Sequence, residues 1–97
     1  PTPSHALATT DPGVRESFAQ DASGLVLVPD AVARPTSREE VVEVLRACAA
    51  ERTPVTVAGA LTGYVGGAVT DRGTVLSLRG LDRIVEVDAA AGVVRAE

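Results

Sequence analysis

The feature that most constrains the fold is an amphipathic helix predicted at residues 37–52, with a strand-like apolar run close on either side. Ser37 and Glu40 have the S-x-x-E spacing of a capping box, which satisfies free backbone N–H groups at a helix start. Thr53 and Pro54 predict the end of the helix, because proline cannot continue it. We expect its buried face to be the apolar residues at helical spacing, which are Val41, Val42, Leu45, Cys48 and Ala49.

Short strands are predicted directly before and after this helix. Residues 31–34 lie between Pro29 and Pro35 and have the length of a short strand. Residues 55–58, "VTVA", have the composition of a second strand. A strand, a helix and a strand joined by short links form a βαβ unit, whose two strands run parallel.

The rest of the chain continues this pattern with strands. After a glycine-rich stretch, residues 74–78 predict a strand. Residues 82–88 and 93–97 predict a β-hairpin, with Gly92 available for a turn residue at positive φ. The fold class is therefore α/β (α+β): a βαβ unit followed by a glycine-rich loop, a strand and a β-hairpin.

Two parts are expected along the chain. Residues 1–20 form a loose N-terminal segment, in which Asp11 as N-cap and Pro12 predict a short helix. Residues 21–97 form the N-terminal part of a domain. Because the last strand pattern runs up to Glu97, we expect that domain to be incomplete here.

Composition excludes several classes of function. The net charge is −4, and the nine basic residues are all arginines spread singly along the chain, which argues against nucleic-acid binding. No apolar run approaches the ~18 residues of a membrane span. One cysteine, Cys48, gives no internal disulfide, and we expect it to be a buried packing thiol in a soluble, cytoplasmic protein.

The other candidate reactive residues have plain explanations. His5, the only histidine, falls in the loose segment and is expected to be an exposed tail residue. Three glutamates near residue 40 suit the first turn of a helix rather than a metal site. Asp21 and Ser23 are typical of turns and caps. We expect no catalytic residue and no metal site in this chain.

The glycine-rich stretch from residue 58 to residue 69 leaves two interpretations open. Successive backbone amides free of bulky side chains can form a concave nest that binds an anion such as a phosphate. The stretch can equally be a plain connection between two strands. A Walker A loop is excluded because the chain has no lysine, and the G-x-G-x-x-G dinucleotide motif is broken at Leu61.

The order of motifs in the chain resembles that of a known family, and this resemblance favours the phosphate-binding interpretation. "RPTSREEVVEVLRACAAERTPV", "VAGALTGYVGGA", "TVLSL" and "LDRIVEVD" follow one another over about residues 21–97. The chain thereby resembles the first half of the FAD-binding domain of the vanillyl-alcohol oxidase and p-cresol methylhydroxylase (PCMH-type) superfamily. It is most similar to the glycolate oxidase and D-lactate dehydrogenase group, in which Asp21 and Ser23 would match a D-x-S element.

The resemblance implies a cofactor site made of backbone. In the family the loop wraps the FAD pyrophosphate, and the matching positions here are Ala58, Gly59, Ala60, Leu61, Thr62 and Gly63, with a second edge at Gly66, Gly67 and Ala68. Tyr64 would either lean on the cofactor or cover the loop.

Three positions depart from the family pattern. Ala58 stands where many members have Arg, so one positive partner of the pyrophosphate is missing. Leu61 stands where Gly is usual, at the tightest part of the loop. Thr62 stands where some branches carry a histidine linked to the flavin, so the resemblance implies FAD held non-covalently.

The resemblance also implies a reaction and partners. The leading hypothesis is the N-terminal portion of an FAD-dependent oxidoreductase that oxidises a 2-hydroxy acid such as glycolate or D-lactate. The rest of the FAD-binding domain and a C-terminal substrate domain would complete the enzyme. Two alternatives are a stand-alone, non-catalytic binding module with the same fold and the related flavin reductase of cell-wall precursor synthesis.

Overall fold

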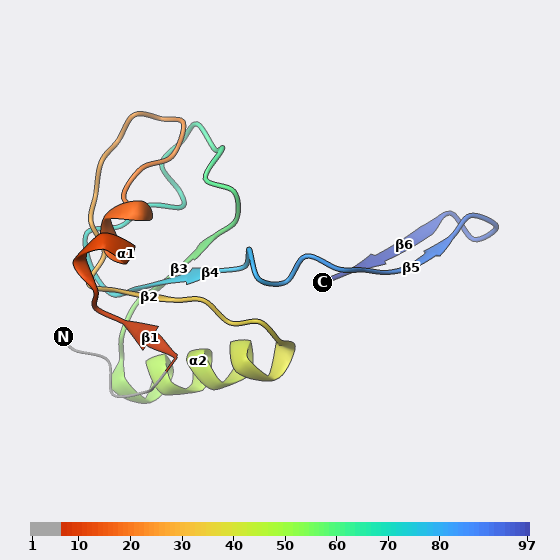
Figure 1. Cartoon of the computed structure of the whole chain (residues 1–97), viewed down its shortest axis with the longest axis horizontal. Coiled ribbons are helices and arrows are strands. Elements are labelled where there is room, and N and C mark those ends of the chain that lie inside the picture. The colour runs from red at the N-terminus through yellow and green to blue at the C-terminus, as the bar shows by residue number, and fades with distance from the viewer. Residues whose placement is uncertain (1–6) are drawn as a thin grey trace.

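The computed structural model of the chain describes residues 7–97, so His5 and residues 1–6 of the N-terminal segment lie outside the described residues. A four-stranded sheet has the order β1-β2-β4-β3, and β5 and β6 form a separate hairpin. Helix α2 lies along one side of the sheet, α1 and two long loops lie on the other, and the hairpin projects away from both (Figure 1). The elements are β1 Ala8–Thr9, α1 Pro12–Ser17, β2 Ala31–Ala33, α2 Arg38–Glu51, β3 Val55–Ala58, β4 Thr74–Ser77, β5 Ile84–Asp88 and β6 Val93–Ala96.

The predicted βαβ unit is confirmed, and β4 lies between its two strands. Val75 of β4 pairs with Val32 of β2 and with Thr56 of β3, and both pairings are parallel. Every residue of β4 is buried, which suits a strand with neighbours on both edges and layers on both faces. The carboxyl ends of β2, β3 and β4 therefore meet at one edge of the sheet.

Gly73 ties the amino ends of these three strands together. Its N–H donates to Asp30 Oδ2 at 2.7 Å, and its carbonyl accepts from the N–H groups of Asp30 and Ala31 just before and within β2. The next N–H, of Thr74, donates to the Pro54 carbonyl at 2.9 Å, just before β3. Gly73 has φ +73, and a Cβ there would lie 2.3 Å from the Pro54 oxygen, so only glycine fits.

Both ends of α2 follow the sequence prediction closely. Ser37 is the N-cap and its Oγ accepts from the N–H of Glu40 at 3.2 Å. The Glu40 carboxylate accepts from the N–H and hydroxyl of Thr36, both at 2.8 Å, and these two bonds lower the pKa of Glu40. The return bond of the capping box thus goes one residue earlier than the standard pattern. Arg52 ends the helix in the left-handed conformation.

The predicted buried face of α2 is only partly right. Val44 and Cys48 are fully buried in the sheet-facing cluster, with Val41 packed beside them. Val42 and Leu45 are 39% and 44% exposed. The buried residues have i, i+3, i+7 spacing, so the face turned to the sheet is rotated by about one residue from the predicted stripe. Burial raises the pKa of the Cys48 thiol, which confirms Cys48 as a packing residue.

The N-terminal segment is partly ordered. Helix α1 begins as predicted, with Asp11 Oδ2 accepting from the N–H of Val14 at 3.1 Å and Pro12 in the first turn. The expectation of a loose segment is wrong for Ala8 and Thr9, which pair antiparallel with β2. The free edge of β2 has backbone groups to satisfy, and two residues of any non-proline type can supply the bonds, so no side-chain pattern signals this strand.

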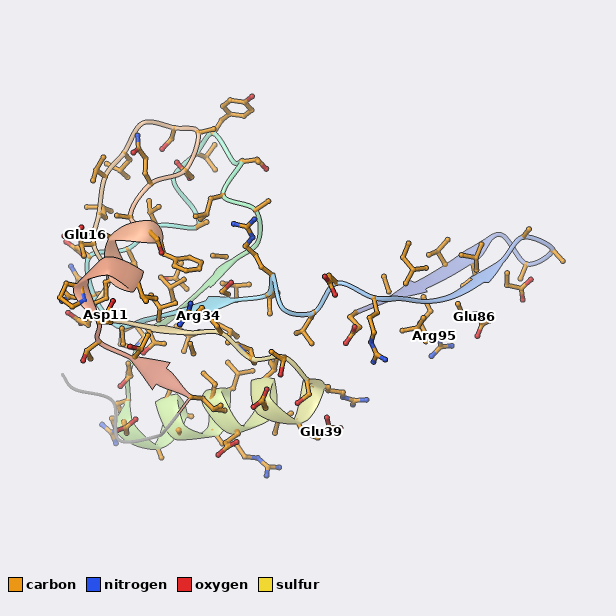
Figure 2. All side chains as sticks on the ribbon, viewed as in Figure 1. Asp11, Glu16, Arg34, Glu39, Glu86 and Arg95 are labelled. Atoms are coloured by element: carbon orange, nitrogen blue, oxygen red, sulfur yellow. The ribbon has the colours of Figure 1, made fainter. Side chains whose placement is uncertain are left out.

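The predicted β-hairpin is confirmed, including Gly92 at φ +68 in its turn. An ion pair between Arg83 and Glu97, at 2.7 Å, closes its base. Glu86 and Arg95 are paired across the strands and lie far from the sheet (Figure 2). Most apolar side chains of the hairpin are at least half exposed, namely Ile84, Val85, Val87, Val93 and Val94.

Replacing Gly73 with alanine tests whether the hydrogen bonds at the start of the three strands depend on a glycine at this position. Gly73→Ala should destabilise the protein by at least about 3 kcal/mol, because positive φ and a backbone clash add together. Gly92→Ala is the matched control: it has the same sign of φ but open space around it, and should cost only about 1 kcal/mol. Denaturant unfolding of both variants measures the difference, and equal losses would contradict the role given to Gly73.

Candidate functional site

Of the ten predicted site residues, Ala58 is the last residue of β3 and the other nine lie on the loop that leads from β3 to β4. The loop lies on the same side of the sheet as α1 (Figure 1). In parallel sheets, ligands gather at the carboxyl ends of the strands. Two exposed arginines also follow strands at this edge, Arg34 directly after β2 and Arg79 two residues after β4.

Three apolar side chains of the loop fix it to the core. Ala58 is fully buried, and its carbonyl accepts from the Leu78 N–H at 2.9 Å, so the loop starts from a fixed point. Leu61 and Ala68 pack against the same cluster from further along the loop. That cluster consists of Phe18, Val32, Ala58 and Val75. The loop is thus held at its start, middle and end.

Between these anchors, the backbone is free to bind a ligand. Among the described residues, no partner accepts a hydrogen bond from the backbone N–H groups of residues 59–65. A Cβ added at Gly59, Gly63 or Gly67 would meet no atom within 4 Å. The loop therefore offers a run of unpartnered N–H donors and open space where glycine lacks a side chain, and an anion-binding nest needs both features.

Leu61, which stands where the resemblance expects Gly, adopts a conformation that favours glycine. Its φ is +58, in the left-handed region. This conformation costs a residue with a Cβ roughly 1 kcal/mol, which the packing of its side chain on the core cluster offsets. The departure from glycine therefore leaves the tight turn in place. Gly66, at φ +75, is the second left-handed residue of the loop.

Thr62 and Tyr64 point away from the core. Both are exposed, and the Tyr64 side chain is 82% exposed. Tyr64 therefore does not cover the loop, and of its two predicted roles only contact with a cofactor stays a prediction. The Thr62 hydroxyl has no partner among the described residues and can donate one hydrogen bond.

A turn at residues 21–25 packs against the loop, which sequence reasoning did not foresee. A Cβ at Gly66 would lie 3.1 Å from Leu25 Cδ2 and 3.8 Å from Ser23 Oγ. Asp21 and Ser23 are turn residues as predicted: the Asp21 carboxylate accepts from the N–H and the hydroxyl of Ser23. The only sequence signal for the contact was the D-x-S element itself.

Other surfaces of the described residues have different chemistry. An apolar groove of about 420 Å³ lies between α2 and the hairpin, with Val41, Leu78 and Val85 among its lining residues. It is remote from the loop and continues the exposed apolar surface of the hairpin. No cluster of His, Cys, Asp and Glu in residues 7–97 has the arrangement of a metal site. No helix in that range is both long and apolar enough to cross a bilayer.

Substitutions of Leu61 test whether it anchors the loop. Leu61→Ala keeps the left-handed strain and loses the packing, so it should cost about 2 kcal/mol of unfolding free energy. Leu61→Gly loses the same packing but relieves the strain, and should cost only about 1 kcal/mol. Denaturant unfolding measures both. An alanine variant as stable as the glycine variant would show that residue 61 carries no strain.

The comparisons with known proteins agree with this geometry. The model of the FAD binding domain family matches residues 29–97. A D-lactate dehydrogenase of Anaerostipes hadrus is 35% identical over 85 residues, which are 84% of this chain and 18% of that protein. Glycolate oxidase subunit GlcD of Bacillus subtilis (strain 168) is 34% identical over 62 residues, or 63% of this chain and 13% of its own length.

Solved structures show the same fold. Two structures of alkyldihydroxyacetonephosphate synthase superpose with TM-scores of 0.71 and 0.68, at 18% and 22% identity. They cover 87% and 86% of this chain, and the matched parts are 20% and 18% of the solved chains. The chain thus spans about a fifth or less of the relatives it matches. The resemblance found in its motifs is confirmed, and the chain belongs to the FAD binding domain family.

Proposed function

We propose that this chain is the N-terminal portion of an FAD-dependent oxidoreductase, and that its glycine-rich loop holds the FAD pyrophosphate. The observation that carries the proposal is the run of unpartnered amides at residues 59–65, at the carboxyl edge of a parallel sheet. A pyrophosphate presents several anionic oxygens, and backbone N–H groups bind them without a bulky side chain in the way.

The residues of the loop divide into two roles. Gly59, Ala60, Thr62 and Gly63 would face the pyrophosphate, with the Thr62 hydroxyl as an additional donor, and Gly67 and Ala68 would form the second edge. Ala58 and Leu61 would not contact the pyrophosphate with their side chains but would hold the loop on the core, since Ala58 is part of the core cluster and Leu61 packs against it. In this way a buried alanine and an anchored leucine can stand at positions where the family has arginine and glycine.

Two features bear on how FAD would be held. Thr62 has no nucleophilic nitrogen, so we propose that FAD is bound non-covalently at this position. Arg34 and Arg79 lie at the same sheet edge and would supply the positive charge that Ala58 does not. Charge–charge attraction of this kind weakens with added salt, whereas the amide contacts do not depend on it to the same degree.

The reaction we propose is the oxidation of a 2-hydroxy acid, which is supported by the identities of 35% and 34% to a D-lactate dehydrogenase and a glycolate oxidase subunit. When bound, FAD supplies the hydride acceptor. The loop described here would bind and orient the cofactor, and groups that act on the substrate would come from a C-terminal substrate domain. The cytoplasmic location expected from the sequence stays a prediction.

The exposed apolar side chains of the hairpin are evidence that further parts of a larger protein pack against it. Ile84, Val87 and Val94 are each more than 60% exposed. Apolar side chains gathered on one element of this size mark a surface that other protein covers. We propose that the rest of the FAD-binding domain packs here. This favours a part of an enzyme over a stand-alone binding module.

A valine at Gly59 tests the cofactor site directly. Because a Cβ at this position meets no protein atom, Gly59→Val should leave the fold intact and obstruct only the space in front of the amides. We expect the complete protein to lose its FAD, measured as flavin absorbance and as free FAD in a denaturing mass spectrum. Ala90→Val, at the exposed tip of the hairpin, adds similar bulk as a control and should keep the cofactor. Full flavin content in Gly59→Val would refute the loop assignment.

A further inference from the structure

The turn at residues 21–25 is built against the second edge of the glycine-rich loop. An antiparallel bridge between Gln20 and Val26 closes the turn, and the Leu27 N–H donates to the Ala19 carbonyl at 2.9 Å. The orange segment that contains this turn and the green-to-teal glycine-rich loop rise together from the sheet (Figure 1). Their contact is at Gly66, where a Cβ would lie 3.1 Å from Leu25 Cδ2 and 3.8 Å from Ser23 Oγ.

Asp21 is the polar centre of this contact. Its side chain is buried, with 7% exposed. One carboxylate oxygen, Oδ1, accepts from the Ser23 N–H at 2.8 Å and from the Ser23 hydroxyl. The other oxygen, Oδ2, is buried and has no hydrogen-bond partner among the described residues. A buried carboxylate oxygen without a donor is costly, so its retention calls for a donor that reaches it.

The glycine-rich loop presents that donor. The pKa of Asp21 is lowered first by the Ser23 hydroxyl, then by the Ser23 N–H, and to a smaller degree by the N–H of Gly66, while burial opposes them. The carboxylate is therefore ionised at neutral pH, and the Ser23 side chain that bonds to it lies against Gly66. The left-handed φ of Gly66 turns the chain at this point.

We propose that Asp21 is a positioning residue of the loop: its free Oδ2 accepts the Gly66 N–H and so fixes the second edge in the shape that receives the pyrophosphate. This proposal rests on the function proposed above and refines it. The Gly66 amide belongs to the protein's own contact, and the neighbouring amides of Gly67 and Ala68 are left for the ligand. Asp21 itself would not touch the cofactor.

The test uses the complete protein and compares Asp21→Ala with Asp21→Asn. The alanine variant should increase amide hydrogen exchange in residues 63–69 of the FAD-free protein and raise the Kd for FAD about tenfold, as expected for loss of one hydrogen bond to a charged group. The asparagine variant keeps one acceptor oxygen but replaces the other with an NH2 donor, which cannot accept the Gly66 N–H while the oxygen bonds Ser23, so its exchange and Kd should lie between those of the wild type and the alanine variant. Asp82→Asn, an exposed acid away from the loop, should change neither quantity.

The outcomes separate this proposal from the one on which it rests. Exchange that rises throughout the chain to the same degree, or that stays unchanged in residues 63–69, overturns the role of Asp21. If the wild-type protein binds no FAD, the proposed function fails, yet the exchange of the FAD-free protein still decides whether Asp21 holds Gly66. If Asp21→Ala does not fold, Asp21→Asn carries the test. Exchange in residues 63–69 and a Kd for FAD that both equal those of the wild type would then contradict the proposal.

Discussion

The sheet depends on the way in which Gly73 enters β4. The Gly73 N–H donates to the Asp30 carboxylate, and the Gly73 carbonyl accepts from the N–H groups of Asp30 and Ala31 at the start of β2. The next residue, Thr74, donates its N–H to the Pro54 carbonyl just before β3. β4, which is separated from β3 by 15 residues, is thereby fixed between two strands that come earlier in the chain. Because the starts of the three strands are aligned, their carboxyl ends are aligned too, and the loop after β3 opens at a common edge.

The candidate site is made of backbone, which apolar side chains of the same loop and a neighbouring turn hold in place. Ala58, Leu61 and Ala68 pack on the core cluster from one side, and the turn at Asp21 packs from another. Between these supports, Gly59, Gly63 and Gly67 have open space beside the backbone, and no described partner accepts from the N–H groups of residues 59–65. Rigid support outside and free amides inside are the two conditions for a preorganised anion site.

Sequence reasoning reached the features that local chemistry specifies. Ser37, Asp11 and Gly92 each satisfy a short-range requirement, and the helices and hairpin they mark are present. The place of β4, the pairing of β1 and the rotation of the buried face of α2 depend on tertiary contacts that no local pattern contains. The same is true in the site: the left-handed Leu61 packs on a cluster that includes residues far away in the sequence, and Ser23 and Leu25 lie against Gly66 from more than 40 residues earlier. Motif order identified the loop, but only packing shows how an atypical residue fits in it.

The β5–β6 hairpin is expected to unfold locally more easily than the four-stranded sheet. Its apolar side chains are mostly exposed, and a single ion pair between Arg83 and Glu97 closes its base. A two-stranded hairpin of this kind is marginal by itself. Its amides should therefore exchange through local fraying, far below the free energy that opens the sheet, until another surface covers it. Slow amide exchange in residues 84–97 would then indicate that another protein surface covers the hairpin, and would say little about the folding of the sheet.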